Sequence, residues 1–198
     1  MVVVPCSTGT LSAIATGACN NLIERAADVL DVAAAWTGEP GRSDLVGLAF
    51  VTDATMSGVT WFEAHLLRDD AVATAIAGHP KVRGHNVKAL MRSLLDADID
   101  LVGLHLDIAI AAYLIDPAEA RYELSDLLDK FTSFAPPSDD AAAAGQLDLD
   151  GTAVGESHRA GRDALAVHHI ADPIEASLEH HGMADLYHSI ENPLVRVL

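Results

Sequence analysis

Histidines and an aspartate near the end of the chain have side chains that could hold a metal ion. They are His180, His181, Asp185 and His188, and His181 and Asp185 lie one helical turn apart. A zinc site needs about four converging ligands with tight spacing. No cysteine accompanies these residues, and Gly182 would end a helix that could align them. We therefore interpret the four as side chains on an exposed polar face.

The stretch at residues 84–88, Gly-His-Asn-Val-Lys, indicates a different chemistry. It resembles the Gly-x-Asn-x-Lys frame of a 3'→5' exonuclease motif, in which an aspartate stands at the position of Leu90. Such enzymes cut a phosphodiester with two divalent ions about 4 Å apart, held by carboxylates. These hard cations bind oxygen ligands, which leucine does not offer. The segment therefore predicts an exonuclease-like scaffold that has lost its reaction.

Apolar patterns predict the elements that would position these residues. Short apolar runs predict strands at residues 2–4, 29–35, 45–52, 58–62 and 82–85. Periodic apolar residues and capping signals predict helices at 8–18, 70–77, 87–95, 107–114, 125–131, near 157, from 172 to Gly182, and from 183 to about 190. Strands followed by alternating strands and helices are typical of an α/β fold with a mixed sheet.

This pattern divides the chain into three parts. Residues 1–134 are predicted to form an α/β core, and residues 157–198 the C-terminal helices of the same domain. Residues 135–156 between them carry prolines, an alanine run and several aspartates, which favours a flexible acidic loop.

Composition limits the partners of the chain. The formal net charge is −17 with only 12 Lys and Arg, so DNA is expected to bind only weakly without a partner. Cys6 and Cys19 form no zinc spacing and fit a reducing cytoplasm. No signal peptide is visible, and His105 and Asp107 interrupt the longest apolar run, so no membrane partner is expected.

The chain resembles the 3'→5' exonuclease-like domain of bacterial DNA polymerase I, especially the actinobacterial type, over about residues 28–198. The resemblance rests on residues 84–88, 106–117 (Leu-Asp-Ile-Ala-Ile-Ala-Ala-Tyr-Leu-Ile-Asp-Pro), 122–127 (Tyr-Glu-Leu-Ser-Asp-Leu) and 190–198 (Ile-Glu-Asn-Pro-Leu-Val-Arg-Val-Leu). It implies a ribonuclease-H-like exonuclease fold, with a mixed β-sheet flanked by helices. It also implies a parent DNA-directed DNA polymerase, whose polymerase domain is the expected partner.

Active members of this family carry three acidic motifs, and the resemblance places their positions here. The first falls on Asp31 and Ala33, and the second on Asn86 and Leu90. The third falls on Ala166 and Ile170, so at most one metal-binding carboxylate remains. We therefore expect a catalytically silent domain without a cofactor, in which Leu90, Ala33 and Ile170 fill the former metal cleft. Its predicted role is structural, in a polymerase of DNA replication and repair.

Several residues allow a second interpretation. Asn86 is interpreted as the cap of the helix at 87–95, although it could be a remnant of substrate contact. His168 and Asp172 could form a shifted late motif, since related exonucleases use histidine there, but Asp172 before Pro173 is typical of a helix start. An active exonuclease that uses unrecognised acids and Mg²⁺ remains an alternative, tested by Asp31→Ala.

A third function class is a protein-interaction module. The string Gln146-Leu147-Asp148-Leu149-Asp150 resembles the short peptide with which bacterial polymerases and repair proteins bind the sliding clamp. Gln146, Leu147 and Leu149 would make the contacts, and an acidic loop could fold on binding. Asp150 stands where that peptide has phenylalanine, which removes an aromatic anchor.

Overall fold

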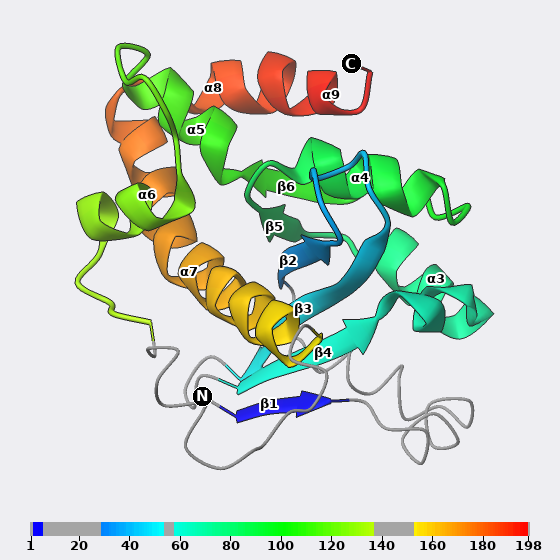
Figure 1. Cartoon of the computed structure of the whole chain (residues 1–198). Helices are drawn as coiled ribbons and strands as arrows, with labels where there is room; N and C mark the ends of the chain where they lie inside the picture. The colour runs from blue at the N-terminus through cyan, green and yellow to red at the C-terminus, as the bar shows by residue number, and fades with distance from the viewer. Residues whose placement is uncertain (1, 6–28, 54–57, 137–152, 198) are drawn as a thin grey trace.

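The structure is a computed structural model that describes residues 2–5, 29–53, 58–136 and 153–197 (Figure 1). A six-stranded mixed sheet in the order β1-β4-β3-β2-β5-β6 forms its centre. Strands β2, β3 and β4 pair antiparallel, whereas β1 pairs parallel with β4, and β5 and β6 continue parallel from β2. The strands are β1 (Val2–Pro5), β2 (Leu30–Trp36), β3 (Leu45–Asp53), β4 (Gly58–Glu63), β5 (Val82–Gly84) and β6 (Leu104–Asp107).

Helices flank this sheet, which confirms the predicted fold class. The long helix α7 crosses one face of the sheet, and α3 and α4 pack against the other (Figure 1). Within the described residues, no helix combines the length and the apolar character needed to cross a membrane. The helices are η2 (Ala64–Arg68), α3 (Asp70–Ala77), α4 (Val87–Leu95), α5 (Ile108–Ile115), α6 (Leu124–Phe131), α7 (Ala153–His180), α8 (Ala184–Leu186), η4 (Tyr187–Glu191) and α9 (Asn192–Val195).

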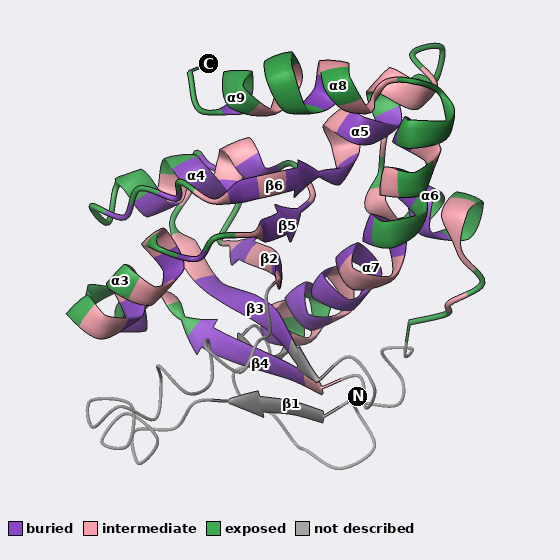
Figure 2. Cartoon of the chain, turned by 180° about the vertical axis from the view of Figure 1, so that it is seen from behind, coloured by how far each residue is buried: buried purple, intermediate pink, exposed green. Residues whose placement is uncertain are grey.

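Alternation along β2 assigns its side chains to the two faces of the sheet. Leu30 and Val32 enter the core that includes α3 and α4, whereas Ala35 joins the core beneath α7. This follows from the two-residue period of a strand. Ala160 and Ala164 of α7 are fully buried in the same layer, and their small side chains let the helix approach the sheet closely. Figure 2 shows this buried surface along β2, β3, β4 and the inner side of α7.

The C-terminal helices differ from the prediction. Instead of one helix near 157 and another starting at Asp172, α7 runs without interruption for 28 residues and contains Pro173. Ile170 and Ile174 on either side of the proline are fully buried, while Pro173 itself is exposed. Packing of this face therefore outweighs the lost backbone hydrogen bond and the local stop signal.

Other boundaries also shifted. Helix α7 begins at Ala153, inside the stretch predicted as an acidic loop, whose residues 137–152 lie outside the described part. The predicted helix at 8–18 lies outside it too. The sequence prediction missed strand β6, because its apolar residues merge with helix α5 into one continuous run.

Candidate functional site

A cavity of about 150 Å³ lies between β2, the start of α4 and α7. Ala33 of β2 and Asn86 and Leu90 at α4 line it, and all three are motif positions placed by the resemblance. From the opposite side, Asp163 and Val167 of α7 line the same cavity. The fold thus brings Ala33 of the first motif together with both positions of the second, and Ala33 and Leu90 present a methyl and an isobutyl group, whereas Asp31 does not line the cavity.

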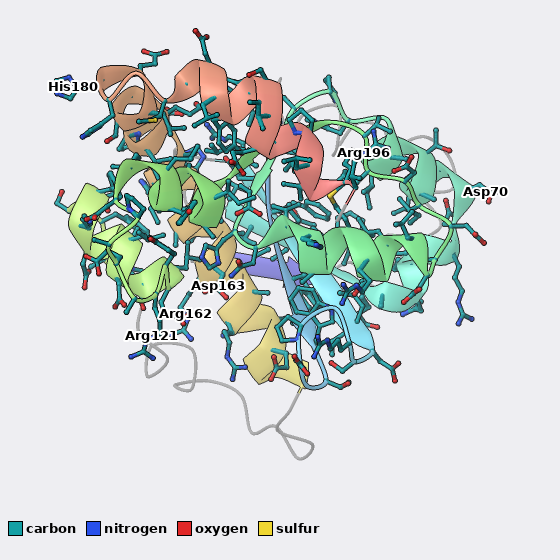
Figure 3. The ribbon with its side chains drawn as sticks, turned by 90° about the horizontal axis from the view of Figure 1, so that it is seen from above. Asp70, Arg121, Arg162, Asp163, His180 and Arg196 are labelled. Carbon is teal, nitrogen blue, oxygen red and sulfur yellow. The ribbon has the colours of Figure 1, made fainter. Side chains whose placement is uncertain are left out.

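Asp163 supplies the acidic side chain among the described residues that line the cavity. Figure 3 labels it on α7 beside Arg162. Burial raises the pKa of the Asp163 carboxyl, and the charges of Arg162, His85 and Arg159 act in the opposite direction without cancelling that effect. A raised pKa disfavours the carboxylate relative to the neutral acid, and the carboxylate is the form that binds a metal ion.

The structure changes the register of the predicted late motif. Ala166 and Ile170 are buried in the core shared by α5, α6 and α7, and neither lines the cavity. Asp163 and Val167 occupy the facing positions instead. Three residues turn an α-helix by about 300°, so the shifted pair points about 60° away from the predicted pair around the helix axis. Ile170 therefore does not fill the cleft.

Asp31 lies in a buried ion pair near the start of β2. Arg83 Nε donates to its Oδ1 at 2.6 Å and Arg83 Nη2 to its Oδ2 at 2.9 Å. The side chains of Asp31 and Arg83 are 5% and 6% exposed. Burial would raise the pKa of Asp31, but hydrogen bonds and charge from His168 and Arg83 outweigh it and hold the pKa below its usual value.

His168 and Asp172 complete this group rather than forming a separate motif. His168 Nδ1 lies 2.7 Å from Asp31 Oδ2, and Arg83 Nη1 donates to Asp172 Oδ1 at 2.7 Å. The interpretation of Asp172 as a helix cap is wrong, because α7 continues through it. The guanidinium of Arg83 lies between two carboxylates and supplies the positive charge that they need.

Asn86 occupies the N-cap position of α4, but its side chain makes no capping hydrogen bond. Its φ of 53° lies in the left-handed region, which asparagine tolerates better than most residues. The carboxylate of Asp107 caps the helix instead, accepting from the N–H of Asn86 at 3.1 Å and of Val87 at 2.8 Å. The sequence prediction was right that Asn86 occupies the N-cap position, but wrong that its side chain makes the capping hydrogen bond.

The C-terminal histidines stand apart from the cavity. His180, His181, Asp185 and His188 are all exposed, and His181 Nδ1 lies 2.8 Å from the backbone oxygen of Ser177. In the part of the chain that the structure describes, no three His, Cys, Asp or Glu side chains are arranged to hold a metal ion. Gln146, Leu147 and Leu149 of the clamp-like string lie outside that part.

Solved structures with a similar fold include nucleases and a polymerase domain. The POL domain of Pol1 from M. smegmatis, in complex with DNA primer-template and dNTP, matches with a TM-score of 0.69 and 22% identity over 91% of this chain and 29% of that one. Brucella melitensis NrnC matches with a TM-score of 0.62 and 14% identity, covering 83% and 80% of the two chains. The EXO domain of Aedes aegypti Nibbler gives 0.56 and 13%, covering 90% and 88%.

The chain has a ribonuclease-H-like exonuclease fold. Identities this low show a shared fold and leave the chemistry to be argued from the site. Three of the positions given by the exonuclease resemblance, Ala33, Asn86 and Leu90, line the cavity between β2, α4 and α7.

The first residues of the chain resemble a different kind of protein. A sequence model of the flavoprotein family matches residues 1–35. Flavin prenyltransferase UbiX of Pseudomonas aeruginosa is 90% identical over 29 residues, which are 15% of this chain and 14% of that protein. UbiX of Halalkalibacterium halodurans is 63% identical over 30 residues, 15% of each. Within residues 1–35 the structure describes β1 and most of β2.

Proposed function

We propose that this is a degenerate 3'→5' exonuclease-like domain that does not cut DNA. One observation carries the proposal: among the described residues that line the cavity, Ala33 and Leu90 face a single carboxylate, that of Asp163. Two-metal phosphodiester cleavage positions two ions about 3.5–4 Å apart and stabilises both the attacking and the leaving oxygen. One half-buried carboxylate with a raised pKa provides too few oxygen ligands for two such ions.

The contacts of Asp31 support the same proposal. Both of its carboxylate oxygens accept from Arg83, and its exposed fraction of 5% leaves little access for a hydrated ion. A metal ion would have to displace a guanidinium that also binds Asp172. Mg²⁺ gives up its water reluctantly, so this exchange is unfavourable.

The role that remains is architectural. We propose that the domain belongs to a polymerase of the DNA polymerase I type and positions a neighbouring polymerase domain. The likeness to the POL domain of Pol1 supports this, and the chain spans 29% of that structure. The net charge of −17 favours weak DNA binding by this domain alone.

An exonuclease assay tests the proposal directly. We expect the wild-type chain with Mg²⁺ or Mn²⁺ to leave a single-stranded oligonucleotide intact, to the same extent as Asp163→Asn and Asp31→Ala. We also expect neither ion to raise the melting temperature, because a ligand that binds the native state stabilises it. Metal-dependent degradation that Asp163→Asn or Asp31→Ala abolishes would establish the alternative, an active exonuclease.

The clamp-binding alternative stays a separate prediction. Residues 146–150 carry the peptide chemistry, and no contact of this string is described. Calorimetry with a bacterial sliding clamp tests it, with Leu147→Ala as the matched variant. Absence of binding, or equal binding by both chains, would end this idea.

A further inference from the structure

A second cavity lies beside α4, and no residue of α7 is among its described lining residues. Its volume is about 220 Å³, and Met91, Leu101 and Val195 contribute buried apolar side chains to its lining. Leu95 on its lining is 57% exposed. Val197, next to the lining residue Arg196, is 77% exposed. Exposed apolar side chains beside a hollow with a buried apolar lining are found at protein interaction sites.

Three cations line the same groove, although the chain has only 12 Lys and Arg and a net charge of −17. Lys88 and Arg92 lie one turn apart on α4, where like charges repel each other. Neither forms an ion pair with another described residue. Arg196 differs, since its Nη2 lies 2.9 and 2.8 Å from the two carboxylate oxygens of Asp100.

We propose that this groove binds a peptide segment of a partner protein in which aliphatic and acidic residues alternate. An aliphatic side chain would fill the cavity over Met91 and Leu101, because a dry hollow of about 150 Å³ already accepts a benzene-sized group. Acidic side chains would pair with Lys88 and Arg92 and relieve their mutual repulsion. The proposal stands independently of whether the first cavity cuts DNA.

The chemistry of the groove favours a peptide over a nucleic acid. No aromatic side chain is among its described lining residues, so bases would find no stacking platform. The rest of the negative surface does not prevent an acidic peptide from binding, because at physiological salt the Debye length is about 8 Å. The local cations therefore dominate the interaction at contact distance.

Fluorescence anisotropy with a labelled synthetic peptide of alternating leucine and aspartate tests the proposal on the full chain. We expect saturable binding that the double variant Lys88→Glu/Arg92→Glu weakens about tenfold or more. Arg68→Glu is the matched control, because Arg68 is an exposed cation on η2 that does not line the groove. We expect this control to bind as the wild type does.

Two altered peptides and a single-stranded oligonucleotide as competitor complete the experiment. Replacing leucine by serine, or aspartate by asparagine, should each reduce binding, since the groove needs both an apolar and an acidic group. Melting temperatures of the variants confirm that they are folded. No saturable binding, an equal loss in Arg68→Glu, or tighter binding of a single-stranded oligonucleotide at Lys88 and Arg92 would overturn the proposal.

Discussion

The contact between Asp31 and Arg83 is a doubly hydrogen-bonded ion pair in which both side chains are buried. The guanidinium binds the carboxylate through two nitrogens, which is the geometry that gives arginine its advantage over lysine. Two charges removed from water must compensate each other's lost hydration. The position that the resemblance assigns to a metal ligand therefore serves folding in this chain.

Replacing Arg83 by methionine is predicted to destabilise the chain by about 3–5 kcal/mol, because it leaves Asp31 charged, buried and without its bidentate partner. Urea denaturation measures the free energy of unfolding. The double variant Arg83→Met/Asp31→Leu should recover most of the loss, since an apolar pair needs no compensation. A double variant as unstable as the single one would contradict this account.

The same pair predicts a pH dependence. Because the pKa of Asp31 is lowered in the folded chain, its contribution to stability is present above the unfolded value of about 3.9 and is lost as the pH falls through the folded pKa. As the pH is lowered below about 4, the melting temperature of the double variant should therefore fall less steeply than that of the wild type.

At the scale of elements, Asp107 organises two helices from the end of β6. Its carboxylate accepts from the N–H of Asn86 and Val87 at the start of α4, and from the N–H of Ala109 in the first turn of α5. Burial raises its pKa even though these backbone hydrogen bonds act in the opposite direction. One side chain thus fixes the position of α4, and with it the placement of Leu90 in the cavity.

Asp107→Ala is predicted to cost about 2–3 kcal/mol, because each lost cap costs about 1 kcal/mol and buried N–H groups remain without an acceptor. Thermal denaturation and amide exchange of α4 measure the effect. Asn86→Gly is the control, since the Asn86 side chain makes no cap and glycine accepts a positive φ. A loss for Asn86→Gly equal to that for Asp107→Ala would show that the cap was assigned to the wrong residue.

At the scale of the whole molecule, the C-terminal segment closes the sheet on one side. Figure 1 shows α8 and α9 running above β6, which is an edge strand. Asn192 Nδ2 donates to the backbone oxygen of Leu104 in β6 at 2.9 Å. Covering an edge strand in this way prevents it from pairing with another chain.

The net charge of −17 predicts a stability that rises with salt. Raising ionic strength from about 0.01 M to about 0.15 M shortens the Debye length from about 30 Å to about 8 Å and screens the self-repulsion of the surface. A gain of about 1 kcal/mol would raise the melting temperature by about 2–4 °C in a domain of this size. Sodium and potassium chloride should act alike, and a fall in melting temperature would contradict the prediction.

The sequence by itself determined the α/β class and the apolar character of two motif positions. Leu90 and Ala33 are apolar whatever the fold, and the apolar residues around them repeat clearly with the periods of a helix and a strand. Strand β6 and the continuity of α7 were not predictable, because β6 merges into a longer apolar run and Pro173 is a local stop signal that packing overrides.

Only the tertiary structure decided which side chain of α7 faces the cavity. Asp163, Ala166, Val167 and Ile170 are close in sequence, yet a helix turns about 100° per residue, so a small error in register exchanges a buried core position for a lining one. Packing of α7 against both the sheet and the neighbouring helices settles that rotation in favour of Asp163 and Val167. The partner of Asp31 could not be read from the sequence for a similar reason, since Arg83 lies 52 positions further along the chain and meets Asp31 only when β2 and β5 pair.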